Sequence, residues 1–236
     1  MRSLRALANI SWLTARQMEA VAGAMTVTHH DKRSTIFSDK TAAESAHILL
    51  AGVARITCEN RKGGRTTVIM LSPGLIPAFP TAVAGITYNF RCEAFTGCQV
   101  GTLGLNAFMK ICLGIGAPPF KLMAASLLGR WDRVHLRCSN LIGCTLDERL
   151  ALVLLDLTEN FGVPNRVGGV RLTVSVRHHH LAELIGASRP RVSERLQEFM
   201  HKQLITQQDD GLVIDSEGLK SFLLEAQNEV ISRDIQ

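Results

Sequence analysis

The sequence predicts an α+β protein with an N-terminal antiparallel β-roll of the jelly-roll kind, a long dimerisation helix and a C-terminal winged helix-turn-helix. Three observations lead to this fold class. Short apolar runs separated by glycine fill the first half, a stripe of apolar residues at alternating spacings of four and three follows, and two helical patterns joined by a glycine precede a hairpin. We place the boundaries at 1–117 for the β-roll domain, 118–144 for the long helix and 145–236 for the winged helix-turn-helix.

Composition and charge limit the classes of protein to consider. The chain has 236 residues, of which 46% are hydrophobic and 20% charged, which is ordinary for two soluble globular domains. A net charge of +5 favours an anionic partner. The first 25 residues have the pattern of an amphipathic helix without the apolar core of a signal peptide, and no run is long enough to span a bilayer. We therefore expect a cytoplasmic protein without a membrane partner.

The β-roll is predicted from short strands that end at glycines. Residues 46–50, 53–57 and 66–71 are apolar or alternating runs, and Gly52, Gly63, Gly64 and Gly74 stand at the intervening turns. This succession is typical of an antiparallel roll or barrel. Residues 76–86 are apolar, which fits either a filled core or a roll that holds a hydrophobic effector.

Six cysteines are scattered through the chain without any C-x-x-C pair. We expect them to be buried free thiols, because a cytosolic setting disfavours disulfides and unpaired cysteines pack as small hydrophobic groups. We predict no metal site. The six are Cys58, Cys92, Cys98, Cys112, Cys138 and Cys144.

The long helix begins after Pro118 and Pro119, and a single apolar stripe follows its length. The spacing of that stripe is typical of a two-stranded coiled coil between subunits, and we predict a homodimer on this ground. The alternative is that the stripe packs on its own β-roll. The predicted interface residues are Phe120, Ala124, Leu127, Trp131, Val134, Cys138 and Leu141.

A break separates this helix from the C-terminal domain. Thr145 is an expected N-cap and Glu148, three residues later, completes a capping box, so a helix is predicted over 146–160 with a hinge near Gly143. Residues 171–176 alternate in polarity and predict a strand.

The helix-turn-helix is predicted from residues 177–214. Gly186 ends an apolar-faced helix, Ser188 is the N-cap of the next helix, and Pro190 falls in its first turn. Val192, Leu196, Phe199 and Met200 recur at helical spacing and should face inward. Residues 204–205 and 212–214 flank Asp209, Asp210 and Gly211 and predict the hairpin called a wing.

The second helix carries the predicted contacts to double-stranded DNA. Arg189 and Arg191 are the leading contacts to base edges or phosphates, and Ser193 and Glu194 are secondary. Glu194 either accepts from a cytosine amino group or orients a neighbouring arginine. The full predicted set is Ser188, Arg189, Arg191, Ser193, Glu194 and Arg195. Three consecutive histidines, 178–180, cannot converge on one metal ion from a helix, and we interpret them as a polar helix entrance near phosphate.

These stretches resemble the CRP/FNR family of bacterial transcription regulators. Its C-terminal domain is similar to LAELIGASRPRVSERLQEF preceded by LDERLALVLLDLTENFG, and its cyclic-nucleotide-binding-type domain to ILLAGVARIT and GGRTTVIMLSPG. The resemblance covers nearly the whole chain. It implies a homodimeric, sequence-specific transcription regulator on a pseudo-palindromic operator, controlled by a small-molecule effector in the roll. For an activator it also implies RNA polymerase as a partner.

Two departures from the family pattern limit what can be carried over. The family often places Arg, Glu and a second Arg early in the recognition helix; this chain keeps Arg189 but has Pro190 and Glu194 at the other two positions. Its phosphate-binding cassette is absent, since Pro77, Ala78 and Phe79 replace Phe-Gly-Glu and no Arg-Ser follows. We therefore expect neither the family's best-known operator nor binding of cyclic AMP, although Arg91 lies near the cassette position.

No cofactor is predicted. A haem-based gas or redox sensor of the same architecture is an alternative, with His29, His30, His47, Cys92 and Cys98 as candidate ligands. An iron-sulfur cluster of the family's oxygen sensors is disfavoured because no cysteine precedes Cys58. A Cys/His redox protein or enzyme is the rival from another class. No nucleophile elbow, phosphate loop or metal-ligand spacing supports it, so we predict that the protein is not an enzyme.

Overall fold

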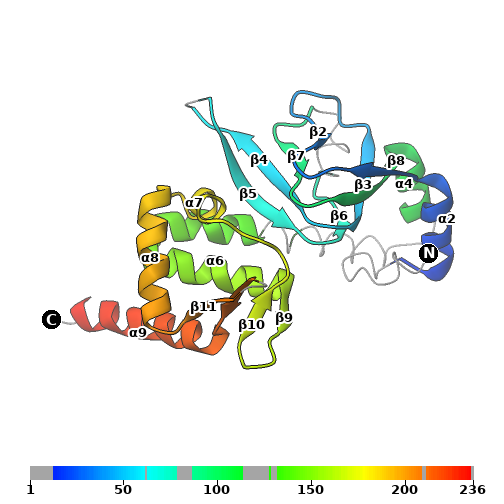
Figure 1. Ribbon diagram of the computed structural model, residues 1–236. Coiled ribbons are helices and arrows are strands. Elements are labelled where there is room, and N and C mark those ends of the chain that lie inside the picture. Colours follow the sequence, from blue (N-terminus) through cyan, green and yellow to red (C-terminus); the bar gives the residue numbers. More distant parts are fainter. Residues whose placement is uncertain are drawn as a thin grey trace. The chain divides into compact units, whose positions relative to one another are not determined.

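The computed structural model describes residues 13–61, 63–78, 87–113, 128, 132–208 and 211–234, with side chains as far as residue 228. The chain divides into two compact units, Met1–His135 and Leu136–Gln236 (Figure 1). This division falls within the range 118–144 that was predicted as the long helix. Each unit is described by itself.

The first unit begins with a capped helix. Helix α2, Ala15–Ala24, starts at Thr14, whose hydroxyl accepts from the backbone N–H of Gln17 at 3.3 Å while the Gln17 amide oxygen accepts from the Thr14 N–H at 2.8 Å. The Gln17 side chain also donates to the carbonyl of Ile111 in α4, Leu105–Leu113, at 3.2 Å. This bond ties the two helices together. The predicted helix at the N-terminus thus exists over α2, and residues 1–12 lie outside the described part.

Two four-stranded antiparallel sheets form the body of this unit (Figure 1). One has the order β1-β8-β3-β6, with bounds Thr26–His30, Cys98–Gly104, Ser45–Ala51 and Gly74–Leu75. The other has the order β2-β7-β4-β5, with bounds Thr35–Phe37, Arg91–Ala94, Ala54–Glu59 and Arg65–Leu71. The predicted strands 46–50, 53–57 and 66–71 correspond to β3, β4 and β5, and the predicted antiparallel roll is confirmed.

Alternation of side chains gives the roll its core. Along β7, Cys92 and Ala94 are buried in a cluster with residues of both sheets, such as Ile56 and Val100, while Arg91 and Glu93 point to the other face. A smaller cluster around Phe108 packs α2 and α4 against β3. The predicted turn at Gly52 is required, because the residue has φ of +86° and a Cβ there would collide with the carbonyl of Gly97.

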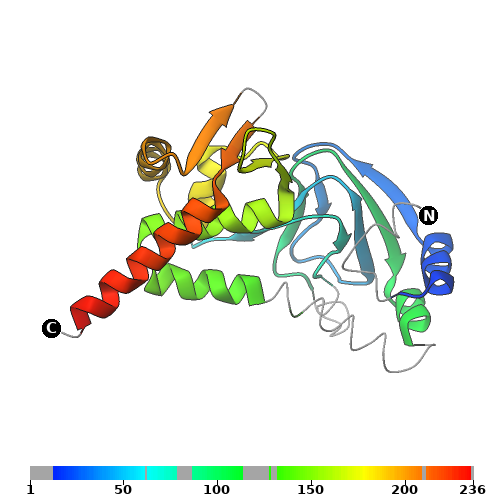
Figure 2. The ribbon, with the colours of Figure 1, turned by 90° about the horizontal axis from the view of Figure 1, so that it is seen from below.

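The second unit opens with the end of the helix that spans 132–143. Helix α6, Leu146–Phe161, follows after Thr145, and the predicted capping box is confirmed. The Thr145 N–H donates to Glu148 Oε2 at 2.6 Å, and the Glu148 N–H donates to Thr145 Oγ1 at 3.3 Å. Helix α9, Ser216–Asp234, packs against α6 (Figure 2).

A small antiparallel sheet with the order β11-β12-β10-β9 completes this unit. Its strands are Ile205–Gln208, Gly211–Ile214, Val170–Leu172 and Gly162–Pro164. The strand predicted over 171–176 is shorter than expected. It ends at Leu172, where its partner β9 begins; the next residue, Thr173, donates from its backbone N–H and its hydroxyl to the carbonyl of Phe161, the last residue of α6, at 2.9 and 2.8 Å.

Within the described residues, no helix combines the length and the apolar character that a crossing of the bilayer requires.

Candidate nucleic-acid interface

Two helices joined by a tight turn form the predicted helix-turn-helix. Helix α7, His178–Ile185, ends at Gly186, which has φ of +64° and ψ of +41° in the left-handed region. Helix α8, Arg189–His201, begins after the N-cap position Ser188, with Pro190 in its first turn. The predicted helix ends are therefore confirmed, although the Ser188 side chain makes no capping hydrogen bond.

The turn is held from the α6 side as well. Arg149 Nη1 donates to the carbonyl of Ile185, the last residue of α7, at 2.9 Å. A carbonyl at the end of a helix has no partner within that helix, so the guanidinium supplies one. The angle at which α8 leaves α7 is thereby fixed by a side chain of a third helix.

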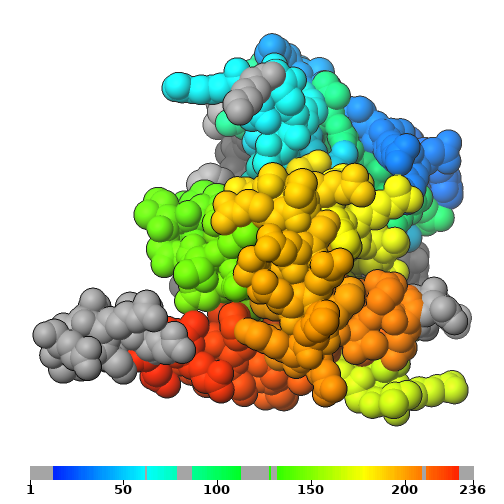
Figure 3. Space-filling view, turned by 60° about the vertical axis from the view of Figure 1, so that its left-hand side comes forward, coloured from blue at the N-terminus to red at the C-terminus, as the bar shows by residue number. Residues whose placement is uncertain are grey.

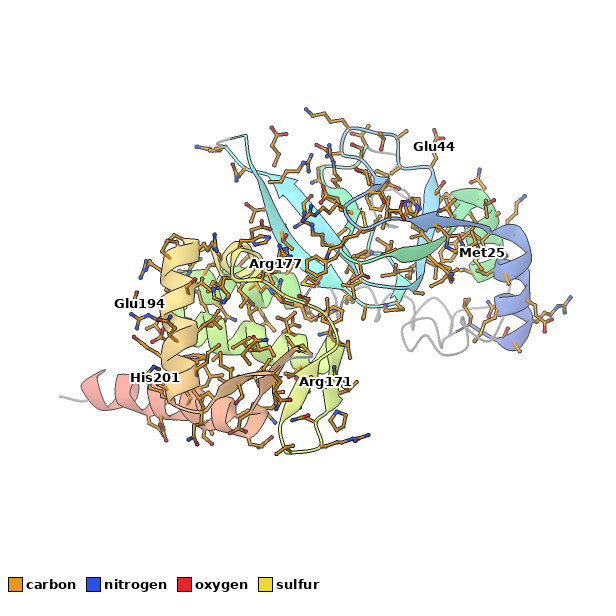
Figure 4. All side chains as sticks on the ribbon, in the orientation of Figure 1. Met25, Glu44, Arg171, Arg177, Glu194 and His201 are labelled. Atoms are coloured by element: carbon orange, nitrogen blue, oxygen red, sulfur yellow. The ribbon has the colours of Figure 1, made fainter. Side chains whose placement is uncertain are left out.

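Helix α8 has one buried and one exposed face. Val192, Leu196 and Phe199 are buried in the domain core, as predicted. At 100° per residue the opposite face carries Pro190, Glu194, Gln197 and His201, all of which are exposed. Figure 4 shows Glu194 and His201 on the side of α8 turned away from α6, and Figure 3 shows α8 at the surface of this unit.

The predicted contact residues fall into two groups. Ser188, Arg189, Arg191 and Glu194 are exposed at the start and on the outer face of α8. Ser193 is half-buried, and its hydroxyl lies 2.7 Å from Nδ1 of His178 in α7 and 3.0 Å from the carbonyl oxygen of Arg189. These two contacts link the start of α7 to the start of α8.

Arg195 is engaged within its own domain. Its guanidinium forms ion pairs with Glu198 at 2.8 Å, Glu194 at 3.2 Å and Asp147 of α6 at 3.7 Å, and its side chain is 28% exposed. Three carboxylates around one guanidinium leave little of its charge for a DNA phosphate.

Two further residues of the outer face were not among the predicted contacts. Gln197 and His201 follow Glu194 at spacings of three and seven, on the same face of α8. The helical spacing of three and then four residues from Glu194 predicts both residues on this face. The prediction concentrated on the first two turns of the helix, where the arginines stand.

The hairpin after α8 has the form of the predicted wing. Strands β11 and β12 pair antiparallel from Ile205 with Ile214 to Gln208 with Gly211. Thr206 and Gln207 are exposed on this hairpin. Asp209 and Asp210, the predicted turn residues, lie outside the described part of the chain.

The histidine triplet is the first turn of α7. Nδ1 of His180 accepts from the Arg177 backbone N–H at 3.0 Å, whereas His178 reaches Ser193. His178 and His179 are exposed. The side chains thus serve different partners. Among the described residues no group of three or more His, Cys, Asp or Glu side chains is arranged to hold a metal ion.

Comparison with known proteins identifies this arrangement. Residues 148–222 match the family model of the Crp-like helix-turn-helix domain. The global nitrogen regulator of Nostoc sp. (strain PCC 7120) is 25% identical over 86% of this chain and 89% of its own. The nitrogen fixation regulation protein FixK of Azorhizobium caulinodans is 25% identical over 78% and 72%. The c-di-GMP responsive global regulator CLP of Xanthomonas campestris shares the fold, with a TM-score of 0.71, 17% identity, and coverage of 86% and 99%.

Residues 148–222 form a Crp-like helix-turn-helix domain, and most of the chain is similar to CRP/FNR-type transcription regulators. The helix-turn-helix of α7 and α8 is its DNA-binding element, and the β-roll has the cyclic-nucleotide-binding fold of the family.

In the first unit, Arg91 is held on the outer face of the roll. It lies beside the buried Cys92 on β7 and forms ion pairs with Asp39 at 3.3 Å and Glu93 at 4.0 Å. The same face carries pairs of Asp39 with Arg65 at 2.7 Å and of Glu93 with Arg55 at 2.9 Å. Arg91, the guanidinium nearest the missing cassette in the sequence, is therefore paired with two carboxylates through Nη1 and Nη2, while its Nε is buried without a hydrogen-bond partner among the described residues.

The candidate haem ligands lie on four strands of the roll, β1, β3, β7 and β8. His29 is exposed on β1 and His30 is half-buried. His47 is buried beside the Phe37 and Tyr88 rings, with Nδ1 3.1 Å from the Thr102 hydroxyl. Its burial lowers its pKa to about 4. A neutral imidazole could ligate a metal, but haem stays an untested alternative.

The six cysteines are free thiols in the structure. Cys92, Cys98 and Cys112 are buried, as expected, and burial raises the pKa of all three, to about 12 for Cys112. Cys98 Sγ lies 3.1 Å from the Val53 carbonyl oxygen, to which the thiol can donate. Cys138 is exposed, and Cys58 and Cys144 are half-buried, so the expectation of burial does not hold for all six.

Three of the seven predicted interface residues lie in the described part of the chain. Val134 packs against the core of its own roll, Cys138 is exposed, and Leu141 approaches Gly186 of its own DNA-binding unit. Phe120, Ala124, Leu127 and Trp131 lie outside the described residues. For Val134, the structure therefore shows the packing on the β-roll that was the alternative to a subunit interface.

Proposed function

We propose that the protein acts as a homodimer that binds a pseudo-palindromic DNA site through two copies of α8, under the control of an effector other than cyclic AMP. A twofold dimer of this fold sets its recognition helices about one DNA turn, ~34 Å, apart. The similarity to CRP/FNR-type regulators supports the dimer, since such regulators typically act in this state. If the protein activates transcription, RNA polymerase is the expected partner.

The observation that carries the DNA-binding role is the exposed start of α8. Arg189 and Arg191 are exposed on the first turn of a helix whose opposite face is packed into the domain. Guanidinium groups at that position suit base edges and phosphates of the major groove. We assign them the leading contacts, with Ser188 and Glu194 beside them.

Two arginine variants test this assignment. Arg189→Ala should weaken binding to the selected DNA site by about 1–3 kcal/mol and relax the preference at one position if it reads a base. Uniform weakening across sequences, with a shallower salt dependence, would make Arg189 a phosphate contact. Fluorescence anisotropy at fixed salt measures both. Arg16→Ala, at an exposed position of α2, is the matched control. Unchanged affinity in both Arg189→Ala and Arg191→Ala would contradict the proposal.

We propose a seam for the dimer that is shifted from the predicted one. Leu128, His135, Cys138 and Ile142 are exposed and follow one another at spacings of seven, three and four, the spacing of a coiled-coil seam. Ile142 is 91% exposed and Leu128 59%. Of the neighbouring stripe, Val134 packs against the roll core, and Leu141, which is 44% exposed, lies near Gly186.

Sedimentation equilibrium tests the seam. Ile142→Glu places two carboxylates at the interface and should shift the protein from dimer to monomer at micromolar concentration. Val167→Glu, at an apolar residue that is 89% exposed on the second unit, should leave the dimer intact. A monomeric wild-type protein, or a dimer unaffected by Ile142→Glu, would exclude this seam.

The absence of a cyclic-AMP role is supported by the occupied Arg91. A buried cyclic phosphate needs a guanidinium or a nest of amides to replace its water, and Arg91 already pairs with Asp39 and Glu93. Titration calorimetry with cyclic AMP and cyclic GMP should give no binding. Micromolar affinity for either nucleotide would overturn this part of the proposal.

A further inference from the structure

The outer face of α8 presents a carboxylate at its centre. Pro190, Glu194, Gln197 and His201 form this face, and the structure describes the whole of α8. Glu194 is the one carboxylate among the four, and its side chain is 62% exposed. Arg189 and Arg191 stand one residue to either side of Pro190, at the start of the helix. In the major groove, α8 would thus present two arginines at its N-terminal end and the carboxylate of Glu194 near its middle.

The carboxylate of Glu194 is held from one side. Its Oε1 lies 3.2 Å from Nη2 of Arg195, whose Nη1 is 2.8 Å from Glu198 and 3.7 Å from Asp147 of α6. Arg195 is therefore anchored to two elements of the domain and can restrain Glu194 without leaving its place. One oxygen of Glu194 has its neighbour in Arg195, and the other is available to a group beyond the helix.

The chemistry of a carboxylate selects among base edges. An ionised carboxylate only accepts hydrogen bonds, and the major-groove edge of guanine offers two acceptors, N7 and O6. Thymine offers O4 and a methyl group. Adenine has one amino donor beside an acceptor, whereas cytosine presents its N4 amino group without an adjacent acceptor. A carboxylate can therefore accept a hydrogen bond from the amino group of cytosine without being repelled by an acceptor atom of the same base.

The negative charge makes this contact selective. A carboxylate brought among DNA phosphates is repelled, and it is tolerated only where an amino group compensates. An acid at the centre of the outer face weakens binding to all other sequences and spares the cognate one. Such an arrangement contributes to specificity by rejecting wrong sites.

We propose that Glu194 is a specificity-determining residue that selects cytosine at one position of each half-site, and that Arg195 is the positioning residue that holds its carboxylate. This inference rests on the proposed entry of α8 into the major groove. It changes the role of Arg195 from a DNA contact to a support for one.

The test is selection of binding sites from a randomised duplex pool by full-length protein, followed by anisotropy with single-base variants. The wild-type protein should select cytosine at one position in each half-site, and a change there should weaken binding roughly 5- to 100-fold. Glu194→Gln should move the preference at that position to adenine, because an amide can both donate to N7 and accept from N6. It should also strengthen binding to unrelated DNA. Glu225→Gln, an exposed glutamate of α9, is the matched control.

Arg195 is tested at the same position. Arg195→Ala should broaden the cytosine preference while leaving the preferences at other positions, and Arg195→Lys should restore part of it. A merely structural role would lower affinity for every sequence alike. Circular dichroism establishes that each variant is folded.

The outcomes separate the two proposals. This inference is overturned if the selected site has no cytosine preference, or if Glu194→Gln leaves that preference unchanged. The DNA-binding role of α8 stands in either case. If no sequence is enriched and Arg189→Ala binds DNA as the wild type does, the proposed function fails as well.

Discussion

The glycine between the two helices of the DNA-binding element gives the sharpest stability prediction. Gly186 has φ of +64°, a left-handed conformation that costs a residue with a Cβ about 1–2 kcal/mol. A Cβ at this position would lie 2.9 Å from Cδ2 of Leu141. Leu141 is 44% exposed and its end can rotate away, so this contact should add little. Gly186→Ala should therefore lower the free energy of unfolding of the second unit by about 1–2 kcal/mol.

Urea unfolding followed by far-ultraviolet circular dichroism measures this loss. Gly186→Asn should cost less than Gly186→Ala, because asparagine tolerates the left-handed region. Gly143→Ala is the matched control: Gly143 lies at the end of the helix over 132–143, has no positive φ, and a Cβ there would meet no atom within 4 Å. That variant should be neutral or gain up to about 1 kcal/mol. Equal losses in Gly186→Ala and Gly186→Asn, or no loss in either, would refute the reasoning.

Three further predictions follow from buried groups and from the seam. Burial lowers the pKa of His47 to about 4, so that between pH 6.5 and 4 only the unfolded chain binds a proton at this residue. The free energy of unfolding of the wild type should therefore fall by about 3 kcal/mol as the pH is lowered through this window. His47→Gln should reduce this fall, as measured by urea unfolding at several pH values. Arg149→Ala removes a charged hydrogen bond to the carbonyl of Ile185 and should lower the free energy of unfolding by about 1.5–3 kcal/mol, whereas an effect below about 0.5 kcal/mol would show that solvent replaces it. In maleimide labelling followed by mass spectrometry, the buried Cys112 should react only when the protein unfolds. Cys138 should react in dilute folded protein, and its labelling should slow as the protein concentration rises and the proposed dimer forms. A labelling rate of Cys138 that does not change with protein concentration would contradict the seam.

Local signals were enough to predict the DNA-binding element. Gly186 and Pro190 each permit few backbone conformations, and Thr145 with Glu148 satisfies two backbone donors at a helix start. Such residues act on their immediate neighbours. Their consequences can therefore be derived from spacing alone, and the structure confirms the helix ends that they predict.

Contacts between distant segments were not accessible in the same way. Arg195 was predicted at DNA because it stands on the recognition helix, but Asp147, far away in the sequence, is brought beside it by the packing of α6 on α8. The strand predicted over 171–176 ends early because its partner strand β9 is short: β9 begins at Gly162, directly after α6 ends at Phe161. Neither partner is visible in a local pattern.

The long helix shows a different limit of pattern reasoning. The sequence has two sets of apolar residues one position apart at heptad spacing, one with Val134 and Leu141 and the other with Leu128 and Ile142. Periodicity detects both but cannot say which is covered by the chain's own domains. Val134 packs against the β-roll core, whereas Leu128 and Ile142 are exposed, which is why we propose them for the seam.

The most direct test of the central claim is a single selection of DNA sites by full-length wild-type protein beside the double variant Arg189→Ala, Arg191→Ala. The account predicts that the wild type enriches one pseudo-palindrome with half-sites about one helical turn apart, and that the variant, equally folded, enriches nothing. An asymmetric site, no enriched site, or the same palindrome recovered with both proteins would contradict it.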